Sequence, residues 1–206
     1  MERVNWSVLF VNASAKAELD ALPSDMRARF ERIVTLIRDH GLEKVREPYV
    51  KHLEDKLWEM RLTGRDGIAR AIYVTASGRR IFVLRTFVKK TQKTPKQELE
   101  LARGTRKGDR MSKRHIPVEE SFKAWREDAA YREAFDALDE EFSLAAALID
   151  ARGQTSQEEV AKRMRTSQPN VARLESGKGN PSINTLRRYA DATGTRLKIS
   201  FEKAAH

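Results

Sequence analysis

The chain has 206 residues, of which 40% are hydrophobic and 34% are charged, a composition typical of well-solvated globular domains. No run approaches the roughly 18 apolar residues of a membrane-spanning helix, and the first residues lack the basic and apolar regions of a secretion signal. Because cysteine is absent and the four histidines are scattered, we expect a cytoplasmic protein with no membrane contact, disulfide, metal or cofactor.

The net charge of +10 is unevenly distributed along the chain. Residues 1–110 hold 24 Lys and Arg against 15 Asp and Glu, whereas residues 111–206 hold 16 against 15. A cationic half of this kind favours a polyanionic partner, usually the phosphates of RNA or DNA. A solvated basic surface without a partner is the alternative.

Residues 1–103 predict an α+β domain, in which an antiparallel sheet packs with helices. A short apolar run precedes a helix that starts near Ser24 and ends at Gly41, with an apolar residue every three or four positions. Thr94 and Pro95 have the spacing of a second helix start. Between these helices lie three strand-like runs separated by glycine-containing turns, at 57–63, 68–75 and 81–88.

The next segments predict a linker followed by an acidic region. Residues 104–117 are polar, contain two glycines and end in proline, which indicates a linker. Met111 either begins what was an independent polypeptide or is an ordinary loop methionine. Residues 118–142 form an acidic helical segment, with nine Asp and Glu against three Lys and Arg and with aromatic residues between them. Charge complementarity predicts that this segment contacts the basic domain; a solvated amphipathic helix is the alternative.

Residues 143–206 predict an all-α domain with a short C-terminal strand. Ser156, Ser167 and Ser182 mark the starts of three successive helices. Apolar residues alternate with polar ones at 197–201, which predicts a strand with an edge free for pairing.

The sequences at 156–164, 167–178 and 180–186 resemble the Cro/C1-type (Xre-like) helix-turn-helix family. The resemblance implies that the helix from Ser167 enters the major groove of operator DNA, and that a homodimer binds a palindrome. Gln168 and Asn170 suit adenine, Arg173 suits guanine or phosphate, and Lys178 suits phosphate. The residues expected to contact DNA are Gln157, Ser167, Gln168, Asn170, Arg173 and Lys178. Arg165 stands where many members have glycine, so the turn geometry is open.

The sequences at 57–61, 69–73, 87–95 and 98–103 resemble the phage-derived Gp49-like group of HigB toxins within the RelE/ParE superfamily. The resemblance implies ribosome-dependent cleavage of mRNA. In operons of this group the toxin gene precedes a helix-turn-helix antitoxin gene, which is the order found here. The acidic segment is then expected to neutralise the toxin, and the helix-turn-helix domain to repress its own operon. Because a short linker gives a high local concentration, we expect the intact chain to be largely silent as a nuclease.

Cleavage of RNA needs a base for the ribose 2′-hydroxyl, cations for the phosphorane and an acid for the leaving oxygen. The superfamily pattern implies five cationic catalytic residues: Arg61, Arg70, Lys89, Lys90 and Lys93. The acid and the base stay open, because Gln92 and Lys96 stand where some relatives have arginine and tyrosine; His52 is an alternative base. Trp58 and Phe87 either stack on bases or belong to the core.

Two other functions stay open at this point. The alternatives to an mRNA-cleaving toxin are a transcriptional regulator with a catalytically inactive RelE-like domain and a ParE-like gyrase inhibitor, and the lysine-rich loop favours RNA cleavage over gyrase inhibition. The expected partners are operator DNA, mRNA on the ribosome, the toxin–antitoxin contact within the chain, and a second copy of the helix-turn-helix domain.

Overall fold

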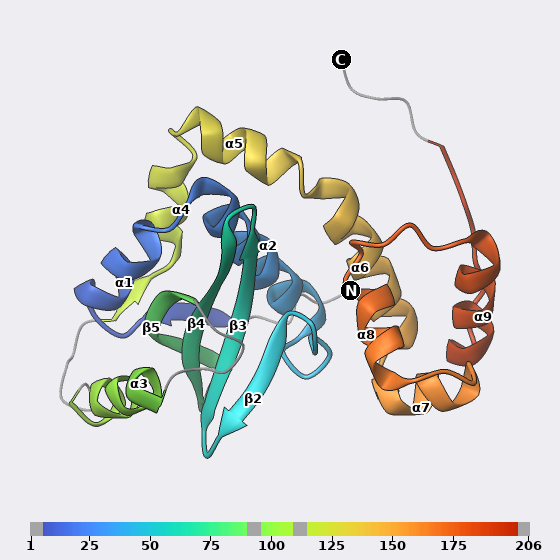
Figure 1. The fold of residues 1–206 in the computed structure, drawn as a ribbon, viewed down its shortest axis with the longest axis horizontal. Coiled ribbons are helices and arrows are strands. Elements are labelled where there is room, and N and C mark those ends of the chain that lie inside the picture. Colours follow the sequence, from blue (N-terminus) through green and yellow to red (C-terminus); the bar gives the residue numbers. More distant parts are fainter. Residues whose placement is uncertain (1–5, 90–95, 109–114, 202–206) are drawn as a thin grey trace.

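A computed structural model of the chain describes residues 6–89, 96–108 and 115–201. Figure 1 shows a sheet-containing part at the left and a helical part at the right, joined by a run of helices that passes over the top of the sheet. The predicted fold class, a sheet-and-helix domain followed by a helical one, is confirmed. Within the described ranges, no helix is long and apolar enough to cross a membrane.

One sheet of six strands forms the centre of the first part, in the order β2-β3-β4-β5-β1-β6. β1 runs parallel to β5, and the other neighbours are antiparallel. The three predicted strands correspond to β3, β4 and β5. The strand bounds are β1 Ser7–Phe10, β2 Val50–Glu54, β3 Leu57–Gly64, β4 Gly67–Ala76, β5 Arg80–Lys89 and β6 Ile116–Pro117.

Among the described residues up to 108, three helices are present: α1 (Ala13–Asp20), α2 (Ser24–His40) and α3 (Lys96–Gly108). α2 buries Met26, Phe30, Ile33 and Ile37 against the sheet and ends at Gly41, as its apolar spacing predicts. Gly41 has φ +90°, a conformation that favours glycine after the last helical turn.

The chain beyond residue 114 begins by extending the sheet of the first part. β6 pairs with β1 through Phe10 with Ile116 and Leu9 with Pro117. Three helices then follow the length of α2: α4 (Glu119–Trp125), α5 (Ala129–Asp136) and α6 (Asp139–Arg152). Side chains of these helices lie in the same hydrophobic core as β1 and α2, among them Phe122, Trp125, Tyr131 and Phe142. Residues 6–89 and 115–149 therefore share one core.

The helical part has a second core of its own, between α6 and three further helices. These are α7 (Gln157–Arg163), α8 (Gln168–Glu175) and α9 (Ile183–Thr193). Val160, Met164, Val171 and Tyr189 meet at its centre. The Ser156 hydroxyl accepts a hydrogen bond from the Glu159 backbone N–H at 3.1 Å, which is the predicted cap of α7. The turn before α8 keeps a left-handed residue although glycine is absent, because Arg165 has φ +52°.

Two boundaries differ from the sequence-based prediction. The predicted linker 104–117 begins inside α3 and ends inside β6. Its polar composition is outweighed at one end by the helical pattern of α3 and at the other end by the pairing of β6 with β1. The predicted strand at 197–201 is not formed: residues 195–201 carry no assigned strand. A strand requires a hydrogen-bonding neighbour, and these residues extend away from the helices in Figure 1.

Candidate nucleic-acid surfaces and the contacts between the two parts

Four arginines of α2 contact the acidic segment. Arg29 forms two hydrogen bonds with the Glu141 carboxylate, at 2.6 and 3.0 Å, and both side chains are largely buried. The other ion pairs of this row are Arg27 with Asp128, Arg32 with Asp139, and Arg38 with Glu119. The expected contact between the basic domain and the acidic segment is therefore present.

Aromatic rings of the segment fill the spaces between these arginines. The Arg32 guanidinium lies 3.9 Å from the centre of the Phe135 ring and donates to the Phe135 carbonyl oxygen at 2.8 Å. The Trp125 Nε1–H donates to Asp20 at 2.9 Å, and the Tyr131 hydroxyl donates to the buried Glu31. Burial and the hydrogen bond with Glu31 raise the pKa of Tyr131 above its ordinary value. We call the packing of residues 116–149 on β1 and α2 the α2 contact.

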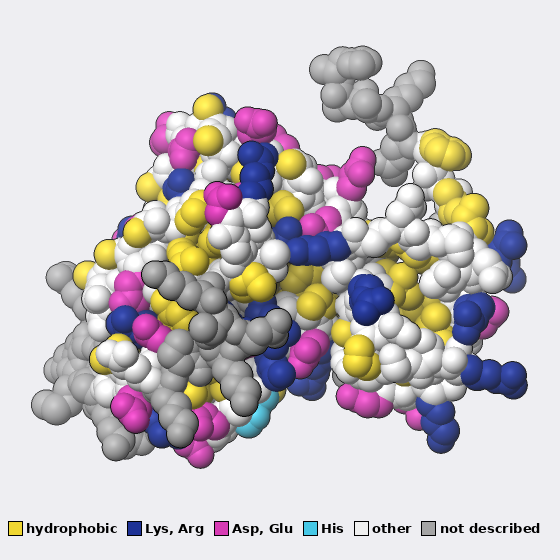
Figure 2. All heavy atoms as spheres, viewed as in Figure 1, with side chains coloured by type: hydrophobic (Ala, Val, Ile, Leu, Met, Phe, Trp, Pro, Cys, Tyr) yellow, Lys and Arg dark blue, Asp and Glu magenta, His cyan; other side chains and the backbone are white. Residues whose placement is uncertain are grey.

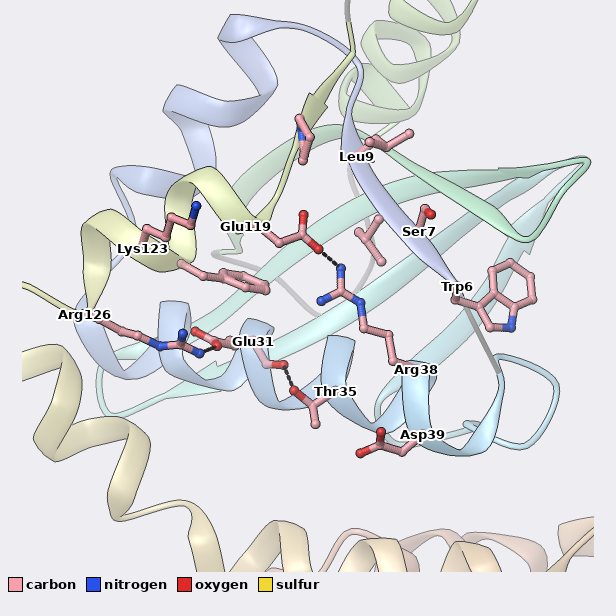
Figure 3. A pocket seen from close by; sticks show the side chains of 13 residues that line it. Trp6, Ser7, Leu9, Glu31, Thr35, Arg38, Asp39, Glu119, Lys123 and Arg126 are labelled. Carbon is pink, nitrogen blue, oxygen red and sulfur yellow. Dashed lines mark hydrogen bonds and ion pairs between the residues drawn. The ribbon is translucent and has the colours of Figure 1, made fainter. Parts of the chain in front are cut away.

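A cavity of about 670 Å³ lies within the α2 contact, between β1, α2, β6 and α4. Figure 3 shows the Arg38 guanidinium reaching across it to Glu119, and Arg126 meeting Glu31 at its other end. Because these charges pair across the junction, the cavity belongs to the joint between the two parts. It holds none of the predicted catalytic or DNA-binding residues.

The predicted catalytic arginines lie side by side on the sheet. Arg61 on β3 stands opposite Arg70 on β4. Between them is Glu59, which is fully buried and accepts hydrogen bonds from Arg61 Nε at 2.9 Å and from Arg70 Nη1. Arg61 is partly exposed and also lies 3.5 Å from the Glu47 carboxylate, whereas Arg70 is 7% exposed. The sequence prediction missed Glu59, although its spacing from Arg61 puts both residues on one face of a strand.

The other predicted residues of this part lie on β2, β3 and β5 or outside the described residues. Lys89 is the last residue of β5 and stands opposite Ile68, while Lys90 and Lys93 lie outside the described residues. The His52 ring packs edge-on against Trp58, and its Nε2 lies 3.1 Å from the Asp55 carbonyl oxygen. Trp58 and Phe87 both pack against the hydrophobic core, in keeping with the core interpretation of these rings.

Several of the predicted DNA-binding residues are exposed on α8 or beside it. Ser167 occupies the cap position of α8 and is exposed, as are Asn170 and Arg173. Asn170 donates to the Thr166 hydroxyl at 3.0 Å. Lys178 follows the helix; partial burial, and then the nearby Arg29, lower the pKa of its ammonium group. These four predicted DNA-binding residues are all exposed.

Gln157 is the first residue of α7, at the start of the helix as expected, but its side chain is buried. It is 4% exposed, and its amide nitrogen donates to the Glu47 carbonyl oxygen and to Glu175, both at 2.8 Å. Its amide oxygen accepts a hydrogen bond from Gln168 at 2.8 Å. The position expected to meet a DNA backbone is thus covered by Glu47, which the sequence could not indicate because Glu47 is 110 residues away.

Two further hydrogen bonds join the same loop to the helical part. Arg152, buried and paired with Glu175 at 2.7 Å, donates to the Lys44 carbonyl oxygen at 2.6 Å. The Tyr49 hydroxyl donates to the Ser176 carbonyl oxygen at 2.8 Å, and burial raises the pKa of Tyr49. We call the packing of residues 43–50 on α6, α7 and α8 the loop contact.

Comparisons with known proteins divide the chain in the same way. Residues 17–107 match the family described as Phage derived protein Gp49-like (DUF891), and residues 150–199 match the helix-turn-helix family. Two curated relatives from Mycobacterium tuberculosis, strains CDC 1551 / Oshkosh and H37Rv, are each named Antitoxin HigA1. Each is 40% identical over 77 residues, which cover 36% of this chain and 52% of the relative. The chain therefore spans about half the length of the curated relatives it matches.

Proposed function

We propose that this chain is a toxin kept inactive by its own antitoxin. It joins a Gp49-like domain to a helix-turn-helix domain, which is the arrangement of a HigB/HigA-type toxin–antitoxin pair. The first part is a ribosome-dependent mRNA endonuclease of the cytoplasm. Residues 116–149 neutralise it, and the helix-turn-helix domain binds operator DNA and represses its own operon. The α2 contact is the observation that carries this proposal.

Neutralisation follows because the α2 contact pairs the positive charges of α2 with carboxylates. Arg27, Arg29, Arg32 and Arg38 form a cationic row suited to ribosomal RNA, and each is paired with a carboxylate of the acidic segment. The segment therefore both covers and neutralises the surface with which the toxin domain would approach a polyanion.

Catalysis is assigned to the cations of the sheet. Arg61 has the exposure needed to reach a phosphate, and Arg70 acts as a positioning residue that holds Glu59, which in turn orients Arg61. Lys89 at the end of β5, with Lys90 and Lys93 after it in the sequence, would supply further positive charge. The groups that transfer protons are left unassigned.

Operator recognition is assigned to α8 and its neighbours. Ser167, Gln168, Asn170 and Arg173 would contact base edges. Lys178 would contact the backbone, as would Gln157 once the loop that covers it has moved away. A palindrome requires two copies of the domain. The C-terminal segment offers apolar side chains for such a homodimer, because Ile199 is 55% and Phe201 99% exposed.

The test uses the full-length chain with the α2 contact broken. We expect Asp128→Arg with Glu141→Arg to arrest bacterial growth and to produce new 5′ ends on translated messages. Adding Arg61→Ala should abolish the cleavage. The matched control is Glu133→Arg with Glu140→Arg, which changes the charge of two exposed residues of the same segment equally and should leave growth normal.

The same measurement separates the competing functions. DNA damage without new message ends would support a gyrase inhibitor. Normal growth and intact messages in the Asp128→Arg, Glu141→Arg chain, together with specific DNA binding, would support a regulator whose first domain is inactive.

A further inference from the structure

The loop contact occupies the part of the helix-turn-helix domain that faces DNA. In this class of domain the recognition helix enters a major groove about 12 Å wide, which admits a helix only if its reading face is free. Here the loop 43–50 reaches the start of α7 and the C-terminal end of α8 (Figure 1). The loop lies against the surface that the duplex must approach.

Two of the residues suited to DNA, Gln157 and Gln168, are also hydrogen-bonded to each other. The side-chain amide of Gln157 has two N–H donors, and Glu47 and Glu175 accept from it, while Gln168 donates to its oxygen. A phosphate that approached Gln157 would find its donors occupied. Phosphate would also meet the Glu47 carboxylate, which lies 3.5 Å from Arg61 and 3.7 Å from Lys51.

The space left between the two parts is a cleft of about 290 Å³. Tyr49, Arg61 and Thr63 line one side of it, and Gln168, Arg173 and Lys178 line the other. Figure 2 shows basic side chains on both sides of the junction between the two bodies. The predicted RNA-facing cation and the predicted DNA-reading residues thus face each other across one narrow cleft.

We propose that the loop 43–50 and an operator duplex compete for the same surface of α7 and α8. This inference rests on the proposed DNA binding of the helix-turn-helix domain. Operator binding then requires the loop contact to separate, and the same separation uncovers Arg61. The apparent affinity for DNA is reduced by the fraction of chains in which the contact is closed.

The first test weakens the loop contact without touching a DNA-facing residue. Tyr49→Phe in the full-length chain removes the hydrogen bond to the Ser176 carbonyl oxygen. The probe is a duplex selected by the wild-type chain from a random library, and fluorescence anisotropy gives its dissociation constant. We expect Tyr49→Phe to bind about fivefold more tightly, because a buried hydrogen bond of the closed form is lost. Tyr131→Phe is the matched control: it removes a tyrosine hydrogen bond of the α2 contact and should leave DNA affinity unchanged.

The second test measures the loop directly. Adding the duplex should speed amide hydrogen exchange in residues 43–50 of the wild-type chain. Slower exchange there, or equal or weaker DNA binding by Tyr49→Phe, would overturn the competition while leaving DNA binding intact. If neither wild type nor Tyr49→Phe selects any duplex, the proposed DNA binding fails, and the competition fails with it.

Discussion

The two contacts between the parts of the molecule are built differently. The α2 contact continues one hydrophobic core, adds a strand to the sheet and places four arginines against carboxylates. The loop contact has hydrogen bonds from three side chains to backbone carbonyl groups, beside a cleft of about 290 Å³, and a ring contact of Tyr49 with Phe142 at 5.3 Å. The α2 contact is therefore expected to stay closed, whereas the loop contact is expected to open at a smaller cost in free energy. The first therefore suits neutralisation, and the second suits competition with a ligand.

The largest test of this difference removes the centre of the α2 contact. Trp125 is 3% exposed and packs against Phe122 and Tyr131. We expect Trp125→Ala to lower the free energy of unfolding by about 3–5 kcal/mol, because it leaves a cavity in a shared core. Urea unfolding followed by circular dichroism measures it.

The matched control for that variant is Trp58→Ala. Trp58 is only partly buried, near the start of β3, so the loss should be less than half as large. Equal losses from both variants would contradict the view that the α2 contact is part of the core.

A smaller effect tests the buried ion pair of the same contact. We expect Arg29→Ala to cost about 3 kcal/mol, because it leaves the Glu141 carboxylate without its guanidinium in a largely buried site. In a double-mutant cycle with Glu141→Ala, the coupling should exceed about 1.5 kcal/mol. The exposed pair of Arg163 with Glu159 should couple by only about 0.3–0.5 kcal/mol. Similar coupling energies in both pairs would mean that burial does not strengthen the ion pair of Arg29 with Glu141.

The stability of the two contacts can be compared in one titration at alkaline pH. Burial raises the pKa of Tyr131 in the α2 contact and of Tyr49 in the loop contact above the ordinary value of 10.0. A raised pKa means that the folded state keeps the proton, so the stabilisation is complete below pH 10 and falls as pH rises above it. Above pH 10, each such tyrosine should lower the free energy of unfolding by about 1.4 kcal/mol per pH unit.

The measurement is the free energy of unfolding between pH 9 and 11, with tyrosinate absorbance as a second signal. Tyr131→Phe should remove the contribution of one tyrosine from the slope of the free energy of unfolding against pH. Tyr49→Phe should do so only as long as the loop contact stays closed. A full decrease of slope for Tyr131→Phe and a smaller one for Tyr49→Phe would show that the loop contact opens before global unfolding.

Much of the fold is predictable from the sequence because its signals are local. The apolar spacing of α2, the turns between β3, β4 and β5, and the cap at Ser156 all act within a few residues. β6 was missed because two residues, Ile116 and Pro117, carry no periodicity and depend on pairing with β1. The strand expected at 197–201 lacks a pairing neighbour in a single chain.

The candidate sites divide in the same way. Exposure of Asn170 and Arg173 follows from the spacing of one helix. The carboxylate of Glu59 between Arg61 and Arg70, and the carbonyl group of Glu47 against Gln157, arise from cross-strand and long-range contacts. Sequence spacing indicates which residues share a face, but it does not indicate what covers that face.

The smallest predicted effect concerns the turn between α7 and α8, within the helical part and apart from both contacts. Arg165 has φ +52°, a left-handed conformation that costs an ordinary residue about 1–2 kcal/mol and costs glycine almost nothing. Glycine loses more entropy on folding, so we expect Arg165→Gly to stabilise the domain by only about 0.5–1 kcal/mol. Thermal unfolding with a signal specific to the helical part measures this, and Lys162→Gly within α7 should instead destabilise. Because the two cores are separate, Arg165→Gly should leave the stability lost in Trp125→Ala unchanged. If the two effects failed to add, the cores would be coupled through α6, and the loop contact would not open independently of the α2 contact.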